Sequence, residues 1–526
     1  MKKILTSSPF SARIWMGLFL FSGWVAPLGA EVQLPSLFAD HMVLQRDIRV
    51  PVWGRGDPGE KVTVSFGGQQ ADVIVSSAGK WRLDLGPFDA TAKSADLIVT
   101  GRNTIVVRDV AVGEVWLCSG QSNMTFTVGE AQNARAEIEA AKFPLIRHYT
   151  VTRSAVDQPA DEVAGTWVVC SPESVADFTA VGYFFARDIQ RELGIPVGLI
   201  HSSWGGTYIE SWMSEETLRK DPAFAVVLKR REEFLAQYPQ AMDRYTAALA
   251  EWKALAAAEQ AAGRKFTEPE PRSPIGPGHR NLPTNLYNGM IRPLVPYGLR
   301  GVLWYQGEAN SARVGEYRAL FAALIGQWRR EWNLGDFPFY FAQLSSFKSF
   351  NKADGEDLGY LREAQAQALE LPNTGMAVTF DVGDADNVHP TNKQEVGRRL
   401  ALIAKGRDYQ LPVVGYSGPI FRALDRQGQT MVLHFEQAAG LNAGGEALRG
   451  FEIAADDSRF VPATSAVGAD GTVNVESGEV PEPVAVRYAW RNVTDGNLVN
   501  AAGLPTGTFR ASLRSYGETT LLRDEF

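Results

Sequence analysis

The chain has 526 residues, of which 45% are hydrophobic and 21% are charged, and its formal net charge is −8. This composition is typical of soluble globular proteins and excludes intrinsic disorder, collagen and coiled coils. A mildly acidic chain without long basic runs is not expected to bind nucleic acid or an anionic membrane surface, since both require concentrated positive charge.

The first thirty residues have the pattern of a secretory signal peptide. Basic residues, the last of which is Arg13, precede an apolar stretch over residues 14–28. Two small residues, Gly29 and Ala30, follow this stretch. The stretch is short for a membrane-spanning helix of about 20 residues, and Pro27 interrupts it. We therefore expect residues 1–30 to be cleaved near Ala30, and the mature protein to be exported to the periplasm or the medium without a membrane anchor.

Residues 31–109 alternate between apolar and polar side chains. Val62, Val64 and Phe66, for example, are separated by polar residues. A period of two places one face of a strand in a core and the other in water. The segment is predicted to form an N-terminal β-sandwich-like module.

Residues 110–410 contain continuous apolar runs separated by stretches of helical spacing. Strands that are apolar on both faces are typical of a parallel sheet covered by helices on each side. The alternation of strand and helix predicts a doubly wound α/β sheet, whose ligands bind at the carboxyl ends of the strands. The runs are residues 115–118, 145–151, 197–200, 302–305, 339–344 and 376–380.

Two further segments complete the predicted organisation. Residues about 215–280 form a helical insertion that ends in a proline-rich loop, and we expect either a lid or a surface elaboration there. Alternation returns in residues 411–526, for example at 484–490, and predicts a C-terminal β-rich module.

A serine follows the first predicted strand of the central sheet. Residues 119–124 read Ser-Gly-Gln-Ser-Asn-Met, which places Ser122 at the edge where ligands bind. A hydroxyl becomes a good nucleophile only when a neighbouring base removes its proton. The pattern GxSxG fails because Met124 occupies its last position, so an α/β-hydrolase nucleophile elbow is not supported.

Six histidines are available as the base. His389 follows the last apolar run, and Asp386 precedes it by three residues. This spacing allows a carboxylate to accept the Nδ1 proton and leaves Nε2 facing a nucleophile. His201, at another strand end, remains a second candidate. The other four lie in the β-rich flanks, in the proline-rich loop or within a strand: His41, His148, His279 and His434.

Two more strand ends offer donors for the oxyanion that develops during acyl transfer. In residues 201–207, glycines such as Gly205 present backbone N–H groups without a side chain in the way. In residues 304–310, the side-chain amides of Gln306 and Asn310 are both candidates. Four strand ends that converge on one edge predict an acyl-transfer site.

These segments resemble the sequence blocks of the SGNH (GDSL-like) hydrolases, in the branch that contains sialate O-acetylesterases and bacterial acetylxylan esterases. The similar segments run through nearly the whole mature chain. They are residues 37–46, 120–124, 204–212, 286–293, 306–310, 361–365, 386–389 and 392–394.

The resemblance implies a flavodoxin-like SGNH sheet and assigns the main catalytic roles. It makes Ser122 the nucleophile, His389 the general base and Asp386 the partner that orients the histidine. It also implies that the backbone N–H groups of Ser122 and Gly205 donate to the oxyanion.

The third block departs from the family pattern. General SGNH enzymes have an asparagine within GxND where this chain reads Gln-Gly-Glu, so Gln306 and Asn310 both remain candidates for the third oxyanion donor. Gln121, Trp204 and Glu308 are expected at substrate-binding positions. Glu308 could equally be a structural acid that orders the site.

The implied function is an exported serine esterase that removes O-acetyl groups from a carbohydrate, with no metal or organic cofactor. Its expected partner is an acetylated glycan. One alternative is a lipase or thioesterase of the same superfamily, and another is a non-catalytic glycan-binding protein. Cys118 and Cys170 are too few for a four-ligand zinc site, and a disulfide between them stays open, as does the oligomeric state.

Overall fold

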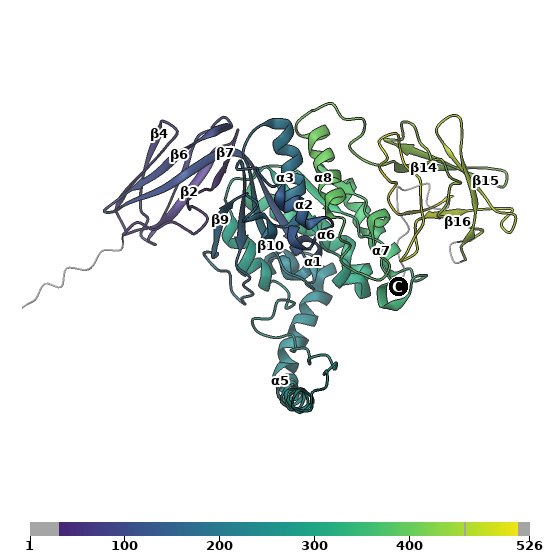
Figure 1. The fold of residues 1–526 in the computed structure, drawn as a ribbon, viewed down its shortest axis with the longest axis horizontal. Coiled ribbons are helices and arrows are strands. Elements are labelled where there is room, and N and C mark those ends of the chain that lie inside the picture. Colours follow the sequence, from purple (N-terminus) through teal and green to yellow (C-terminus); the bar gives the residue numbers. More distant parts are fainter. Residues whose placement is uncertain (1–30, 457–458, 514–526) are drawn as a thin grey trace, which may run out of the picture.

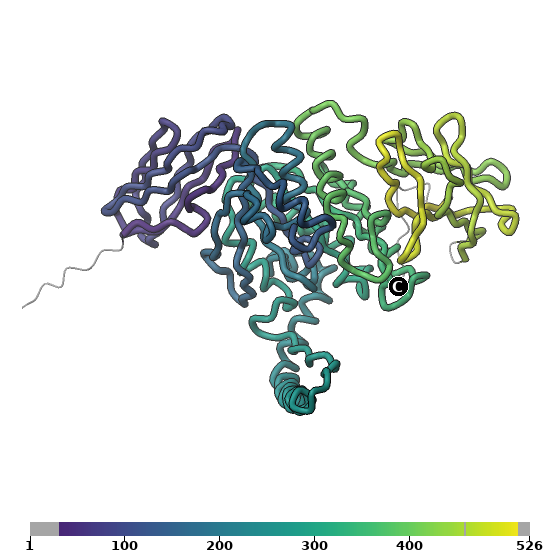
Figure 2. Tube along the Cα trace, viewed as in Figure 1, coloured from purple at the N-terminus to yellow at the C-terminus, as the bar shows by residue number. Residues whose placement is uncertain are grey.

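The computed structural model describes residues 31–456 and 459–513, so the predicted signal peptide lies outside the described residues. Figure 1 shows a β-rich part at one end of the molecule, an α/β body in the middle and a second β-rich part at the other end. The chain passes through these parts in sequence order, as the trace in Figure 2 shows. The predicted α/β class is confirmed, and β-rich parts lie on both sides of the body.

The N-terminal strands bury one face, as their alternating sequence predicts. In β3 (Lys61–Phe66), Val62 and Val64 are fully buried. β7 (Thr104–Gly120) belongs to two parts, because its first half pairs antiparallel with β6 (Thr91–Thr100) and its second half lies in the sheet of the body. The remaining strands here are β1 (Val43–Gln45), β2 (Val50–Arg55), β4 (Gln69–Ile74) and β5 (Lys80–Leu85).

The sheet of the body has the strand order β13-β12-β11-β7-β10-β8-β9. All neighbours in this order are parallel except β8 and β9, which are antiparallel. Each predicted apolar run overlaps one of the parallel strands, because strands covered on both faces have few polar positions. β9 has no counterpart among those runs. The strands are β8 (Ile146–Val151), β9 (Gly165–Val169), β10 (Val197–Ser203), β11 (Gly301–Tyr305), β12 (Phe339–Ala342) and β13 (Thr374–Ala377).

Helices cover both faces of this sheet. Consecutive residues of a strand point to opposite faces, and Phe341 of β12 packs on Phe321 of α6. Its neighbour Tyr340 stacks on Trp116, which also contacts Phe185 of α3. One face therefore carries α3 (Ala180–Leu193) with α8 (Lys393–Arg407), and the other carries α6 (Val314–Trp332) with α7 (Asp357–Ala366).

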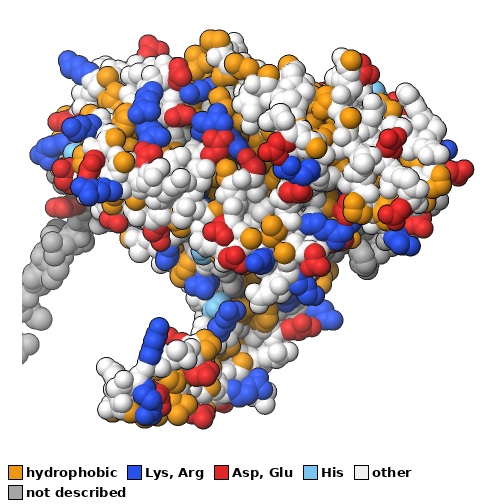
Figure 3. Space-filling view, turned by 45° about the vertical axis from the view of Figure 1, so that its right-hand side comes forward, with side chains coloured by type: hydrophobic (Ala, Val, Ile, Leu, Met, Phe, Trp, Pro, Cys, Tyr) orange, Lys and Arg blue, Asp and Glu red, His pale blue; other side chains and the backbone are white. Residues whose placement is uncertain are grey.

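A long helix projects from the body (Figure 1). This helix, α5 (Ala225–Ala261), lies in the segment expected to be helical, and Val227 near its start is its one buried residue. On the face shown in Figure 3, acidic and basic side chains are interspersed over the body and the projection. No helix in residues 31–456 or 459–513 is both long and apolar enough to cross a membrane. The shorter α-helices are α1 (Ser122–Thr125), α2 (Ala134–Glu139) and α4 (Glu215–Lys220).

The three central strands bring their carboxyl ends together. Ser203 of β10 and Tyr305 of β11 are both in register with Gly120, the last residue of β7. Gly120 has φ +132°, and a Cβ there would lie 2.2 Å from the carbonyl oxygen of Tyr305, so this close approach requires glycine. The segments that follow these three strands therefore leave the sheet side by side.

The C-terminal part contains two four-stranded antiparallel sheets. They share a core with Val378 and Phe380, which follow the last strand of the body. Arg362 of α7 is fully buried and donates hydrogen bonds to the carbonyl oxygens of Arg491 and Asn492. The strands are β14 (Ile420–Gln427), β15 (Thr430–Glu436), β16 (Phe451–Ala454), β17 (Val461–Pro462), β18 (Thr464–Val467), β19 (Val473–Glu476), β20 (Ala485–Tyr488) and β21 (Phe509–Ser512).

Candidate active site

The predicted nucleophile and the predicted base share one open pocket at the carboxyl edge of the sheet. Ser122 is the first residue of α1, directly after β7, and His389 lies in the loop before α8. The structure thus brings together two residues that are far apart in the sequence. The pocket is lined by Ser122, Thr125, Phe126, Glu130, Arg153, Trp204, Gly205, Arg280 and His389.

The segment after β10 lies against Ser122. The N–H of Trp204 donates to the carbonyl oxygen of Gly120 at 3.1 Å. A Cβ on Gly205 would lie 3.2 Å from the Cβ of Ser122. Among the described residues, the backbone N–H groups of Ser122 and Gly205 have no hydrogen-bond acceptor. Two unoccupied donors therefore lie beside the hydroxyl, an arrangement suited to an oxyanion.

His389 is half-buried beside a positive charge. Burial lowers the pKa of its imidazole, the charge of Lys393 lowers it further, and Glu130 acts in the opposite direction. An imidazole with a lowered pKa is neutral near pH 7, which is the form that accepts a proton. Chemically, the pocket combines a hydroxyl with a neutral base.

Asp386 does not contact His389 in this structure. Its Oδ1 accepts a hydrogen bond of 2.7 Å from Nζ of Lys348, and its side chain is 79% exposed. The local turns explain the difference from the spacing argument, because the N–H of Asp386 donates to Asp384 and the N–H of His389 donates to Asn387. These two Asx turns direct the carboxylate outward.

A buried network that the sequence analysis did not identify connects the serine and histidine segments. Nδ2 of Asn123 donates to Oε1 of Glu308 at 2.5 Å and to the carbonyl oxygen of Val388 at 3.0 Å. Nζ of Lys393 donates to Oδ1 of Asn123 at 2.5 Å. Asn123 and Lys393 are fully buried. Asn123 thus holds the residue before His389 close to the residue after Ser122.

The charges in this network are strongly perturbed. Burial lowers the pKa of Lys393 to about 7, although the nearby Glu308 favours its charged form. Burial raises the pKa of Glu308, against the hydrogen bond from Asn123. The hydrogen bond between Glu308 and Asn123 is the contact expected of an acid that orders the site. One signal for Lys393 was present in the sequence, because this residue lies within a segment similar to the SGNH branch, residues 392–394.

The two side-chain amides proposed as oxyanion donors are engaged elsewhere. Nε2 of Gln306 donates both to the carbonyl oxygen of Thr207 and to Oδ1 of Asn310, which uses both of its hydrogens. Nδ2 of Asn310 donates to Oε2 of Glu210. Both side chains are fully buried and neither lines the pocket. In this structure their hydrogen bonds connect residues 306–310 with the segment that follows β10.

Of the residues expected to bind the substrate, some line the pocket and others are buried away from it. Trp204 lines the pocket beside Ser122. Gln121 is buried, and its Oε1 accepts hydrogen bonds from the N–H groups of Gly307 and Ala309. Of the three expected residues, Trp204 is therefore the one that lines the pocket of Ser122 and His389, whereas Glu308 lines a different pocket.

His201 is buried and does not line the pocket. Its Nε2 is 2.6 Å from Oγ of Ser203, which is 2.8 Å from Oγ1 of Thr125. Burial, and after it the charge of Arg153, lowers the pKa of His201 to about 4. The imidazole is thus neutral and joined to Ser203 rather than to Ser122.

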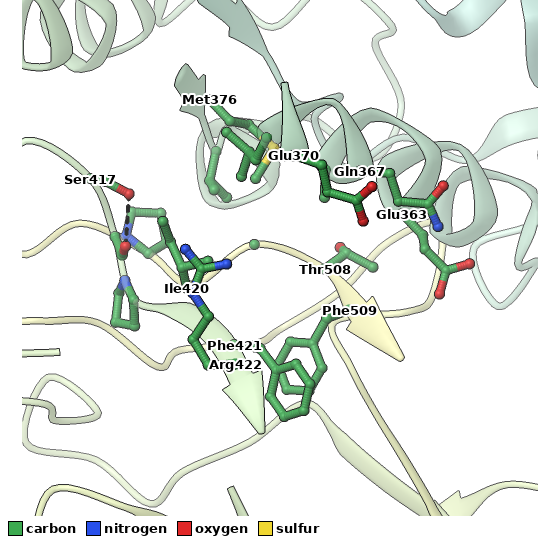
Figure 4. Close-up of a pocket in the computed structure, with 17 residues that line it drawn as sticks. Glu363, Gln367, Glu370, Met376, Ser417, Ile420, Phe421, Arg422, Thr508 and Phe509 are labelled. Atoms are coloured by element: carbon green, nitrogen blue, oxygen red, sulfur yellow. Dashed lines mark hydrogen bonds between the residues drawn. The ribbon is translucent and has the colours of Figure 1, made fainter. Parts of the chain in front are cut away.

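Another pocket lies between the body and the C-terminal sheets. Figure 4 shows Glu370 and Gln367 on its helical side and the stacked rings of Phe421 and Phe509, 4.5 Å apart, on its β side. None of the predicted site residues lines it. Over the described ranges, no group of three His, Cys, Asp or Glu residues is arranged to hold a metal ion, and Cys118 and Cys170 are buried free thiols.

Comparison with known proteins identifies relatives over most of the chain. The family described as "Carbohydrate esterase, sialic acid-specific acetylesterase" matches residues 112–256 and 275–405. The sialate O-acetylesterase of Mus musculus is 29% identical over 510 residues, which are 88% of this chain and 90% of the mouse protein. That of Homo sapiens is 29% identical over 514 residues and 88% of each chain.

A solved structure is also similar. The crystal structure of a carbohydrate acetylesterase from Xanthomonas citri has 36% sequence identity and a TM-score of 0.77. The similarity covers 91% of this chain and 99% of that protein. The segment that carries Ser122 and the one that carries His389 both fall within the residues that the family matches.

Proposed function

The chain belongs to the sialic acid-specific acetylesterase family of carbohydrate esterases, and we propose that it removes O-acetyl groups from a glycan by serine-esterase chemistry. The observation that carries the proposal is the shared pocket of Ser122 and His389. The names of the mouse and human relatives support an acetylated sugar as the substrate.

In the proposed reaction, Ser122 attacks the acetyl carbonyl while His389 accepts the hydroxyl proton. His389 then gives this proton to the departing sugar oxygen, which leaves an acetyl-enzyme. His389 next activates a water molecule, whose attack releases acetate and restores the serine. The free N–H groups of Ser122 and Gly205 support an oxyanion site made of backbone donors.

Asp386 is proposed as the orienting partner of His389 after a small movement of its loop. Its pair with Lys348 is exposed on both sides, with side chains 79% and 41% exposed. Exposed ion pairs of this kind contribute about 0–1 kcal/mol. Exchanging Lys348 for the imidazole is therefore energetically accessible.

The remaining proposals concern the whole chain. We propose that residues 1–30 direct export, and that residues 110–410 form a doubly wound SGNH domain between β-rich modules at 31–109 and 411–526. Helices on both faces of the sheet and the position of β7 between β10 and β11 support this organisation.

Substitution of the serine tests the proposed function. Ser122→Ala should abolish hydrolysis of p-nitrophenyl acetate and leave the melting temperature unchanged. Ser119→Ala is a matched control from the same segment, because the Ser119 hydroxyl is buried without a hydrogen-bond partner among the described residues. It should retain activity within about twofold. Hydrolysis by Ser122→Ala would refute the serine assignment.

Acyl-chain length separates the deacetylase from a lipase or thioesterase. Activity of the wild-type enzyme on p-nitrophenyl acetate, butyrate and octanoate should fall steeply beyond the acetyl ester. An increase toward octanoate would favour the lipase alternative.

A further inference from the structure

The pocket between the body and the C-terminal sheets shares no lining residue with the pocket of Ser122 and His389. One wall comes from the end of α7 and from the 3-10 helix that follows it, Gln367–Glu370. The opposite wall comes from the first residues of β14 and β21 and from the segments that precede these strands (Figure 4). The pocket is therefore distinct from the candidate active site, and two parts of the chain build it.

The two walls are bound to each other. Arg510 of β21 donates hydrogen bonds of 3.3 and 3.1 Å to the carboxylate of Glu363 in α7, and both side chains are buried. The N–H of Thr508 donates to Oε1 of Gln343 at 3.4 Å, and its hydroxyl donates to the carbonyl oxygen of Ala489 at 3.0 Å. A ligand that enters this pocket therefore meets side chains that are already ordered, which lowers the entropic cost of binding.

A buried amide oxygen in this pocket has no hydrogen-bond donor. Gln367 lines the pocket and is 9% exposed, and its Oε1 has no partner among the described residues. Leaving a buried acceptor unpaired is costly, and a native structure usually supplies a partner for it. The pocket thus offers an acceptor to a ligand that can donate a hydrogen bond.

The charged side chains of the pocket disfavour an anionic ligand. Arg422 is the one basic residue among those that line it, and its guanidinium group is paired with Glu436 at 2.8 Å. Glu370 on the helical wall is exposed and lies 3.9 Å from Arg318. A bound carboxylate would be repelled by Glu370, whereas the arginine of the pocket already has a partner. A neutral ligand with hydroxyl donors is favoured.

The rest of the lining is mostly apolar. Phe421 is half-buried, and its ring stacks on that of Phe509 with the centroids 4.5 Å and the planes 8° apart. Aromatic rings present large apolar faces that can cover the C–H groups of a sugar ring. Such a ring combines apolar C–H faces with hydroxyl donors on its edge. The other apolar lining residues are Leu369, Met376, Val378, Pro419, Ile420 and Pro505.

We propose that this pocket is a second, non-catalytic binding site for a neutral sugar unit, in which Gln367 accepts a hydrogen bond from a sugar hydroxyl and Phe421 packs on the ring. A glycan chain contains uncharged units besides the one that carries the ester, and a unit held here tethers the chain to the enzyme. Tethering raises the effective concentration of the glycan at the proposed nucleophile. The site is independent of the proposed reaction, because binding in this pocket does not involve Ser122.

Binding of neutral oligosaccharides to the Ser122→Ala variant tests the site without turnover. The probes are xylohexaose, cellohexaose and mannohexaose, each titrated into the protein by isothermal titration calorimetry. We expect at least one of them to bind with a Kd of about 0.1–10 mM. N-acetylneuraminic acid should not displace it, because the pocket disfavours a carboxylate. Failure of all three to bind, or displacement by the acid, would overturn the proposal.

Substitutions in the Ser122→Ala background locate the bound sugar. Gln367→Met removes the acceptor at similar volume and should weaken binding about fivefold or more. It should not lower the melting temperature, because the unpaired oxygen is removed as well. Phe421→Leu keeps an apolar side chain but loses the ring, and should also weaken binding. Gln190→Met is the matched control, since Gln190 lies in α3 and does not line the pocket. Unchanged binding in either pocket variant, or an equal loss in the control, would contradict the proposal.

The second site and the esterase assignment fail separately. A saturating concentration of the bound oligosaccharide should leave hydrolysis of p-nitrophenyl acetate by the wild-type enzyme unchanged, because the sugar binds away from Ser122. Competitive inhibition with a constant equal to the measured Kd would place the sugar in the pocket of Ser122, so the second site would be wrong and the serine mechanism would stand. Retained activity in Ser122→Ala would refute the serine mechanism and leave the binding measurements unaffected.

Discussion

Lys393 donates a 2.5 Å hydrogen bond from its ammonium group to Oδ1 of Asn123, the residue that follows the proposed nucleophile. The same asparagine donates to the carbonyl oxygen of Val388, next to the proposed base. One buried amide, held by a buried lysine, therefore connects the segments that carry the proposed nucleophile and the proposed base. Lys393 contacts Asn123 and does not line the pocket, so we infer that it is a positioning residue.

Removing the charge of Lys393 should change the pH profile. The ammonium group lowers the pKa of His389, so Lys393→Met should raise that pKa. The base must be deprotonated, and the acid limb of kcat/KM should therefore move to higher pH. We also expect kcat on p-nitrophenyl acetate to fall about tenfold, because the asparagine loses its anchor.

Lys405→Met controls for the loss of a lysine from the same helix. Lys405 forms an ion pair with Glu192 and contacts none of the proposed site residues. Lys405→Met should therefore keep the wild-type pH profile. An unchanged acid limb in Lys393→Met would show that Lys393 contributes only to the fold.

The lowered pKa of Lys393 also predicts how stability depends on pH. Its pKa is about 7 in the folded protein and about 10.4 in an unfolded chain. Between these values the unfolded chain binds the additional proton, so the free energy of unfolding rises with pH by up to about 1.4 kcal/mol per unit. Lys393→Met should lose this rise.

Chemical denaturation at pH 7, 8 and 9 measures the effect as a difference between wild type and variant. The stability of the wild-type protein relative to Lys393→Met should increase across the series. If the free energies of unfolding of the two proteins changed with pH by the same amount, Lys393 would have its ordinary pKa in the folded state.

The pairing of Asp386 gives a further test. If Asp386 leaves Lys348 to orient His389 during the reaction, Asp386→Asn should lower kcat by about 10²- to 10⁴-fold. Lys348→Met removes the partner seen in the structure and should keep activity within about twofold, since the pair is exposed. Steady-state kinetics on p-nitrophenyl acetate distinguish the two. Equal small losses in both variants would show that Asp386 has no part in catalysis.

The sequence predicted the features that depend on local pattern. The parallel strands are predictable because both of their faces are apolar, and the position of Ser122 at the edge of the sheet is predictable because it follows one of them directly. Asp386 shows that the spacing of two residues in the sequence does not by itself predict a contact between their side chains. It lies only three residues before His389, but the loop contains two Asx turns and the two side chains do not meet in this structure.

The contacts between distant segments could not be predicted from one sequence. A lysine in an amphipathic helix is usually solvent-exposed, whereas Lys393 is fully buried because Asn123, 270 residues earlier, accepts its hydrogen bond. Arg153 and Arg280 belong to a strand end and to a proline-rich return loop, and only the folded chain places both beside Trp204.

The closeness of Gly205 to the serine predicts a specific loss of activity. The Cβ of Gly205→Ala would lie 3.2 Å from the Cβ of Ser122, a contact tight enough to displace the serine by a few tenths of an ångström. We expect kcat on p-nitrophenyl acetate to fall by about 10- to 100-fold, because small misplacements of reacting groups are costly, with little change in melting temperature. Gly315→Ala is the matched control, since its Cβ would meet no atom within 4 Å near the start of α6. Alanine there should stabilise the helix by about 0.5–1 kcal/mol and leave kcat unchanged. Full activity in Gly205→Ala would show that this glycine lies farther from the reacting carbonyl than the proposed oxyanion site requires.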